Sequence, residues 1–377
     1  MMTAGRTLLA VALGLGTVTS AMFAQTNSTA DATVYVMTNA ADRNEVIAYT
    51  RSYDGRFSEA DRYITGGRGS GGTNDPLQSQ GSLTLSADHS LLFAVNAGSG
   101  TLTSFRVSLY GQLELAGNVT TGGSEPLAVA SQGNRVFVLD GAGAGTIVGF
   151  SLDEFGQLHA IPKSSAFLSA TSAGGSSISI TRDGKFLVVT ERLTNSLDTF
   201  AISADGTLGP IQTIASPVPG IFSGRFDPEG QFILSATGPA GATNASTISS
   251  FSVNSDGALV AVTKSLPTLG NANCWNAVTP NGKFAYVSNA GSSTISAFSI
   301  GTDGTLKGLG STIAATQAEN TTNLDISVSG DGNYLYTLNS MVGTVSVFKI
   351  NADGSLTSEG SIDGLPANVG FNGIAAL

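Results

Sequence analysis

The stretch that decides the fold is "AVTPNGKFAYVSNAGSSTISAFSIGTDGTLKGLGSTI", Ala277–Ile313. Its segments "KFAYVS" and "TISAFSI" either alternate between apolar and polar residues or are continuously apolar. They are rich in β-branched and aromatic residues, which is typical of strands. Asn281-Gly282 predicts a hairpin turn, because glycine accepts the positive φ that such turns require. Asp303-Gly304 turns the chain into a further strand. The stretch therefore predicts a unit of four antiparallel strands.

The same unit recurs along the chain. A turn of the form x-Gly-x-Leu/Phe occurs seven times, with spacings of 56, 45, 50, 51, 47 and 50 residues. Its glycines are Gly55, Gly111, Gly156, Gly206, Gly257, Gly304 and Gly354. A period near 50 residues is typical of a propeller blade or a solenoid turn.

The two ends of the repeat complete each other. The first unit begins directly at its second strand, "TVYVMTN", and the chain ends in "VGFNGIAAL", which has the pattern of an innermost strand. Pairing of this last strand into the first unit would close a ring and remove the exposed sheet edges. An open solenoid would need capping units, and none is visible. We predict an all-β, seven-bladed β-propeller with four antiparallel strands per blade.

The first 24 residues have the layout of an export signal. Arg6 precedes an apolar run to about Val18, and small residues follow up to Ala21 and Ala24. Cleavage is expected after one of these alanines, and the run is too short for a comfortable membrane span. We expect residues 1–24 to be a signal peptide, residues 25–377 to be a single propeller domain, and the protein to be secreted or periplasmic without a membrane anchor.

Composition narrows the classes of partner. The net charge of −10 argues against binding to nucleic acid. One cysteine cannot form an intramolecular disulfide. A closed propeller is self-sufficient, so we expect a monomer.

The repeats resemble a known family. "ISITRDGKFLVVTERLTNSLDTFAISADGTL", residues 178–208, and the stretch quoted first are similar to the lactonase-type seven-bladed propellers, which include 6-phosphogluconolactonase and carboxymuconate-cyclising enzymes. The resemblance covers essentially the whole mature chain. It implies an exported hydrolase with a remodelled site, acting on a sugar or organic-acid lactone.

The resemblance also implies where a site would lie. Family members place Pro-Arg-His or Pro-His where an innermost strand begins, and a glutamate in the loop after the second strand. Here Ser177 and Trp275 occupy histidine positions, and every histidine of the family pattern is replaced. "TERL" aligns Glu191 with the family glutamate, and Arg192 follows it.

Propeller topology brings the candidate residues to one face, around the central funnel. The candidate catalytic residues are Glu191, Arg192, Arg225 and Asp325, which could polarise a lactone and activate water. The candidate ligand-binding residues are Trp275, Asn276, Ser177, Asn323, Asp75 and Glu125. The alternative is that these charged residues are solvated rim residues or form a local ion pair. Trp275 could stack on a sugar ring or pack in the funnel wall. The connection "TGGRGSGGTNDPLQSQGS", residues 65–82, is predicted as a flexible loop beside the funnel mouth.

Metal and thiol chemistry have weaker support. The funnel acids are scattered over the blades and no loop has dense ligand spacing, so we predict no metal site or cofactor, with Ca²⁺ as a weakly supported alternative. Both histidines, His89 and His159, fall on the opposite face, so Cys274 lacks a base and is not expected to act as a nucleophile.

The second candidate function is a non-catalytic binding propeller. The missing family histidines favour it over hydrolysis. Such a protein would hold a small carbohydrate or lactone, a glycan or a protein partner at the funnel or the rim.

Overall fold

The computed structural model describes Met1 and residues 32–52, 55–318 and 321–377. The fold reported below is that of the compact unit Asp31–Leu377. Apart from Met1, the predicted signal peptide lies outside the described residues. None of the described residues belongs to a helix with the length and hydropathy that crossing a bilayer requires.

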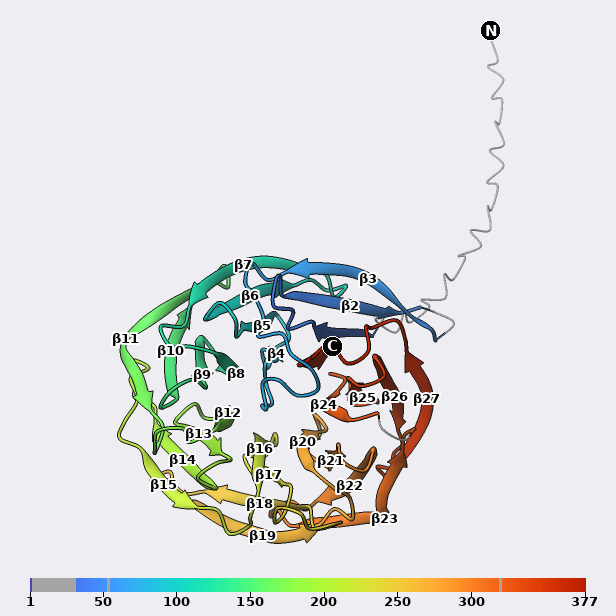
Figure 1. Cartoon of the computed structure of the whole chain (residues 1–377). Coiled ribbons are helices and arrows are strands. Elements are labelled where there is room, and N and C mark those ends of the chain that lie inside the picture. The colour runs from blue at the N-terminus through green and yellow to red at the C-terminus, as the bar shows by residue number, and fades with distance from the viewer. Residues whose placement is uncertain (2–31, 53–54, 319–320) are drawn as a thin grey trace. The chain divides into compact units, whose positions relative to one another are not determined.

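Seven four-stranded antiparallel sheets are arranged around a centre, as predicted (Figure 1). Blade 1 contains β28 (Ile374–Ala376), β1 (Thr33–Met37), β2 (Glu45–Arg51) and β3 (Phe57–Ile64), and blade 2 contains β4 (Leu83–Leu85), β5 (Leu91–Asn96), β6 (Thr101–Val107) and β7 (Leu113–Thr120). Blade 3 contains β8 (Pro126–Gln132), β9 (Arg135–Asp140), β10 (Thr146–Leu152) and β11 (Leu158–Phe167). Blade 4 contains β12 (Gly175–Ile180), β13 (Phe186–Glu191), β14 (Ser196–Ala201) and β15 (Gln212–Ala215), and blade 5 contains β16 (Ile221–Phe226), β17 (Phe232–Ala236), β18 (Thr247–Val253) and β19 (Leu259–Pro267). Blade 6 contains β20 (Asn273–Val278), β21 (Phe284–Asn289), β22 (Thr294–Ile300) and β23 (Leu306–Thr316), and blade 7 contains β24 (Asn323–Val328), β25 (Tyr334–Asn339), β26 (Thr344–Ile350) and β27 (Leu356–Ile362).

The last strand closes the ring in blade 1. β28 pairs antiparallel with β1, with Tyr35 opposite Ala375. Backbone bonds from Met37 to Gly373 (3.1 Å) and from Leu377 to Thr33 (3.0 Å) extend this pairing at both ends. The closing strand is therefore an integral, fully paired member of its sheet.

The repeated turn glycine connects neighbouring blades. At five of the seven turns its carbonyl oxygen accepts a hydrogen bond from a hydroxyl group of the preceding blade: Tyr35 to Gly111, Ser104 to Gly156, Ser164 to Gly206, Ser250 to Gly304, and Tyr286 to Gly354, at 2.6–2.8 Å. Gly111 has φ +74°, and a Cβ there would lie 2.3 Å from Thr33 Oγ1. Glycine is required here by both conformation and space.

The core lies between the faces of adjacent blades. The second strand of each blade is almost completely buried, as in β9 and β21, whereas the outermost strands β3, β7 and β15 are largely exposed. This gradient leaves the innermost strands β4, β8, β12, β16, β20, β24 and β28 around the centre of the ring (Figure 1).

Candidate functional site

The centre of the ring is closed by the chain itself. The connection between β3 and β4 passes over the centre of the ring (Figure 1), and its part Asp75–Gly81 is here called the plug segment. Leu77, Ser79 and Gln80 are buried. The loop predicted to stand flexibly beside the funnel mouth instead enters the channel.

Hydrogen bonds fasten the plug segment to four blades. Ser79 Oγ donates to the Leu127 carbonyl of blade 3 (2.9 Å), and Gln80 N donates to the Ser176 carbonyl of blade 4 (2.9 Å). The Gln80 side-chain amide donates to the Asn276 carbonyl of blade 6 (2.9 Å) and to Asp325 Oδ1 of blade 7 (3.0 Å). Gln80 was missed in the sequence because one glutamine in a polar loop carries no distinguishing pattern.

At the funnel mouth, Asp75, the first residue of the plug segment, is one of a pair of charged groups. Asp75 Oδ1 accepts hydrogen bonds from Gln78 N (3.0 Å) and Asn372 Nδ2 (2.9 Å), whereas no described residue donates to Oδ2. Burial raises the pKa of Asp75 to about 7, partly opposed by those hydrogen bonds and by the charge of Arg192. The structure thus holds one carboxylate oxygen and leaves the other free.

Arg192 is the cation of this pair. It directly follows β13 and is half-buried, and its Nε atom has no hydrogen-bond partner among the described residues. Burial lowers the pKa of its guanidinium, and the nearby Asp75 carboxyl partly opposes this. Within the described part of the chain Arg192 forms no ion pair.

Cys274 lies near Asp75 and Arg192 in β20, with 9% of its surface exposed. Burial strongly raises the pKa of its thiol, and the Asp75 carboxyl raises it further. A protonated thiol is a poor nucleophile, so this geometry gives no support to thiol catalysis.

Glu191 is directed into the blade rather than into the funnel. It is the last residue of β13 and is 0% exposed. Ser169 N and Oγ donate to its two carboxylate oxygens (2.8 and 2.5 Å), and Thr194 Oγ1 donates as well (2.5 Å). These bonds engage both carboxylate oxygens of Glu191.

The same position in other blades explains this arrangement. Asn96 and Asn289 also end the second strand of their blades. Each accepts from a threonine of the preceding blade, Thr65 (2.6 Å) or Thr268 (3.0 Å), and donates to a hydroxyl of the third strand, Thr103 or Ser296. Glu191 occupies this inter-blade position, with Ser169 in place of the threonine.

In blade 4 the third-strand partner is Asp198, which is also fully buried. Burial and the neighbouring Glu191 carboxyl raise the pKa of Asp198 to about 8. Burial would raise the pKa of Glu191, but its hydrogen bonds to Asp198, Ser169 and Thr194 outweigh this and lower it. An alignment of the repeats indicates this pair, because "TNSLD" (residues 194–198) ends in an acid, Asp198, where "SSTIS" (residues 292–296) ends in a serine, Ser296.

Asp325 and Arg225 lie deeper along the channel. Asp325 is buried, and its carboxylate accepts hydrogen bonds from Gln80 Nε2 and from the backbone N–H groups of Ile326 (2.9 Å) and Ile374 (3.3 Å). Burial raises the pKa of Asp325 to about 6, against the opposing charge of Arg225. Arg225 interacts electrostatically with Asp325 and not with Asp75 or Arg192. The four predicted catalytic residues therefore lie at three separate places.

Trp275 packs in the funnel wall, one of the two alternatives. It is 1% exposed, meets Phe222 edge-on with ring centroids 5.1 Å apart, and donates from Nε1 to the Ser79 carbonyl (2.9 Å). A buried ring cannot serve as an open stacking platform in this conformation.

The other predicted ligand-binding residues differ in access. Asn276, Ser177 and Asn323 are buried and bonded to neighbouring strands: Asn276 Nδ2 to Ser235 Oγ (3.1 Å), Ser177 Oγ with Thr190 Oγ1 (2.8 Å), and Asn323 Nδ2 to the Thr294 carbonyl (3.0 Å). Glu125 is exposed at the start of blade 3. Of the predicted ligand-binding residues, Glu125 and Asp75 are the more accessible.

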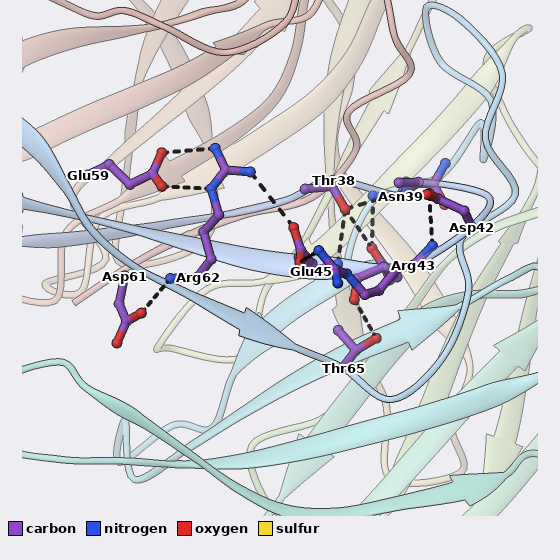
Figure 2. A network of polar contacts seen from close by, with 11 residues as sticks. Thr38, Asn39, Asp42, Arg43, Glu45, Glu59, Asp61, Arg62 and Thr65 are labelled. Carbon is purple, nitrogen blue, oxygen red and sulfur yellow. Dashed lines mark hydrogen bonds and ion pairs between the residues drawn. The ribbon is translucent and has the colours of Figure 1, made fainter.

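A second polar network lies on blade 1 (Figure 2). Arg62 binds Glu59 through Nε (2.6 Å) and Nη2 (2.9 Å) and lies 3.7 Å from Glu45, which also pairs with Arg43 (2.8 Å). An adjoining cavity of about 250 Å³ is lined by Arg43, Glu45 and Arg62, among others. Its two arginines are balanced by the acids Asp42 and Glu45, so the lining has no net formal charge.

Metal ligands are not gathered at either place. In residues 32–52, 55–318 and 321–377, no group of three or more His, Cys, Asp or Glu side chains is placed to hold a metal ion. His159 bonds to Asp153 (3.0 Å) beside a third-to-fourth-strand turn, and His89 lies in a first-to-second-strand turn.

Known structures share this architecture. A proposed 6-phosphogluconolactonase from Bacteroides fragilis is 18% identical, with 93% of this chain and 98% of that chain covered and a TM-score of 0.66. The periplasmic gluconolactonase PpgL of Pseudomonas aeruginosa is also 18% identical, with 91% and 99% covered and a TM-score of 0.68. At this identity the likeness shows the fold alone. The comparison with curated proteins gave no match.

The sequence also matches a family model described as "Lactonase, 7-bladed beta-propeller". The matches cover residues 21–163, 144–275, 225–324 and 276–365, which together span nearly the whole propeller. The chain belongs to the seven-bladed β-propeller lactonase family.

Proposed function

We propose that this protein hydrolyses a lactone at the funnel mouth, with Asp75 as general base and Arg192 as the group that polarises the carbonyl. The observation that carries the proposal is the free Oδ2 of Asp75, on a carboxyl whose pKa is raised to about 7, beside an Arg192 without an ion-pair partner among the described residues. A general base is most effective when its pKa lies near the working pH.

The reaction needs only water as co-substrate. Asp75 Oδ2 takes a proton from a water molecule whose oxygen forms a bond to the lactone carbonyl carbon. The guanidinium of Arg192 stabilises the negative charge that develops on the carbonyl oxygen. When the ring C–O bond breaks, protonated Asp75 returns its proton to the leaving alkoxide, which gives a hydroxy acid.

The charge at the mouth favours an unphosphorylated substrate. One cation, Arg192, lies near Asp75, and the Asp75 carboxyl also interacts with the negative charge of Asp325. A phosphate group would require several converging cations. We therefore propose a sugar lactone or organic-acid lactone, handled by a monomer without a metal or organic cofactor after export to the periplasm or the medium.

The second candidate is ligand binding without turnover. It is favoured by the placement of both histidines in turns away from the mouth pair and by the burial of Glu191. In this case Asp75, Arg192 and Glu125 would hold a carbohydrate or lactone at the mouth, or the rim would hold a glycan or a protein.

Proton release from δ-gluconolactone and γ-butyrolactone, measured above the rate in buffer, separates the two candidates. The hydrolase predicts saturable turnover that is lost in Asp75→Asn and retained in Asp42→Asn, which alters an exposed acid on the same face. Saturable binding without proton release would establish the binding protein instead. Turnover that survives in Asp75→Asn would exclude Asp75 as the base.

A further inference from the structure

The plug segment divides the channel and leaves a separate chamber on its far side. A cavity of about 260 Å³ is bounded by Gln80 and Gly81 of the plug segment and by the later residues of the innermost strands of blades 2, 3, 4 and 5. Innermost strands run from the funnel mouth to the first-to-second-strand turns, so this chamber opens toward the turn face. It shares no lining residue with the pair at the mouth.

Arg225 is the one charged residue among those that line the chamber. It is the penultimate residue of β16, and its guanidinium makes no hydrogen bond or ion pair with any described residue. The nearest acid, Asp325, has both carboxylate oxygens engaged by other donors and acts on Arg225 only at longer range. Arg225 is half-buried, so its guanidinium has lost part of its hydration without gaining a protein partner, and an anion would restore that interaction.

The other walls supply no second charge. Leu85, Val129, Ile180 and Phe226 give apolar surface, and the hydroxyl groups of Ser131 and Ser179 are polar but neutral. The volume is below the usual range of about 300–1,000 Å³ for drug-sized ligands. A ligand with one anionic head and a short apolar body fits this combination, whereas a polyanion would find one cation only.

We propose that the chamber is a second binding site, specific for small aliphatic monocarboxylates, with Arg225 binding the carboxylate and the apolar wall receiving the tail. The site does not depend on the proposed hydrolysis, because its ligand reaches Arg225 from the turn face and does not contact Asp75 or Arg192.

Isothermal titration calorimetry of the full propeller with butanoate tests this proposal, with butanamide as the neutral analogue and inorganic phosphate as the polyanion. The expected result is saturable 1:1 binding of butanoate, with butanamide and phosphate at least about tenfold weaker, as expected for a lost charge-assisted hydrogen bond. No butanoate binding to the native protein, or tighter binding of phosphate, would overturn the proposal.

Variants locate the site. Arg225→Gln should weaken butanoate binding about tenfold or more, and Arg182→Gln, at an exposed arginine near the same face, should leave it unchanged. Ala87→Trp, at an exposed residue that lines the chamber, should obstruct entry while leaving Arg225 and the core intact. Butanoate binding that survives in both Arg225→Gln and Ala87→Trp, or that disappears in Arg192→Gln instead, would contradict the proposal.

Discussion

Glu191 and Asp198 are two fully buried, interacting carboxyl groups on the adjacent strands β13 and β14 of blade 4, two residues apart in register. Asp198 Oδ1 accepts from Thr213 Oγ1 (2.7 Å), and no other side chain donates to Oδ2. Two carboxylates cannot bond each other without a proton between them. We therefore expect the pair to bind one proton, held on Asp198, because donors from Ser169 and Thr194 stabilise the charge of Glu191.

This shared proton makes the stability of the protein depend on pH. The pKa of Asp198 is about 8 in the folded protein and near 4 in the unfolded chain, so the folded state binds the extra proton between these values. The stabilisation is complete below about pH 4 and is lost as the pH rises through 8. We expect Asp198→Asn, which keeps an N–H donor toward Glu191, to be more stable than the native protein at pH 9 by about 1 kcal/mol.

Urea unfolding of the two proteins at pH 5, 7 and 9 measures this effect. The free energy of unfolding of Asp198→Asn should change less with pH than that of the native protein. Asp205→Asn, at an exposed acid in a turn of the same blade, provides the control. An equal pH dependence in the native protein and Asp198→Asn would exclude the shared proton.

Lactone hydrolysis should follow the ionisation of Asp75. A base works in its deprotonated form, so kcat/KM should rise with pH through about 7 and level off above it. Asp75→Asn should lower kcat by about 100-fold or more. Glu191→Gln should change the free energy of unfolding more than kcat, because both carboxylate oxygens of the buried Glu191 accept hydrogen bonds from Ser169. A rate profile that is flat between pH 5 and 9 would contradict the assignment of Asp75.

Removal of the Gln80 side chain should loosen the plug segment. Gln80→Ala removes the donors to the Asn276 carbonyl and Asp325, and it also removes the acceptor of the buried Asn276 N–H, which costs about 1–3 kcal/mol. Differential scanning calorimetry should show a lower Tm. Gln78→Asn is the matched control, because Gln78 is exposed and has φ +49°, a conformation that asparagine tolerates. Equal Tm values for the two variants would contradict the role of Gln80.

The fluorescence of Trp275 should report the environment beside the plug segment rather than bulk solvent. Its buried indole predicts blue-shifted emission with little quenching by acrylamide until the protein unfolds. Trp275→Phe should lower stability by about 1–3 kcal/mol, through the lost bond to Ser79, with little effect on the KM for lactones. A large rise in KM with unchanged stability would instead support the stacking role.

The sequence predicted the blade architecture because each blade repeats a local pattern. Asn281-Gly282 and Asp303-Gly304 specify turns through backbone conformation alone, and the missing first strand before "TVYVMTN" predicted closure by "VGFNGIAAL". These are properties of short segments, which do not depend on contacts between distant residues.

The site could be predicted only in part, because it depends on contacts between distant segments. Arg192 and Asp75 were among the expected funnel residues, but their neighbourhood depends on a long connection that enters the channel. No local pattern distinguishes such a loop from an exposed one. Arg225 was expected beside Glu191, yet the plug segment separates the turn-face chamber from the mouth.

The closure of the ring in blade 1 also places the two ends of the propeller beside each other, since Leu377 N bonds to the Thr33 carbonyl. A short peptide could join them, and the chain could be opened at an exposed turn such as Asp331-Gly332. Such a circular permutant would retain all seven sheets, because β28 and β1 would become consecutive strands of one hairpin. The order of the blades along the chain therefore depends only on the position at which the ring is opened.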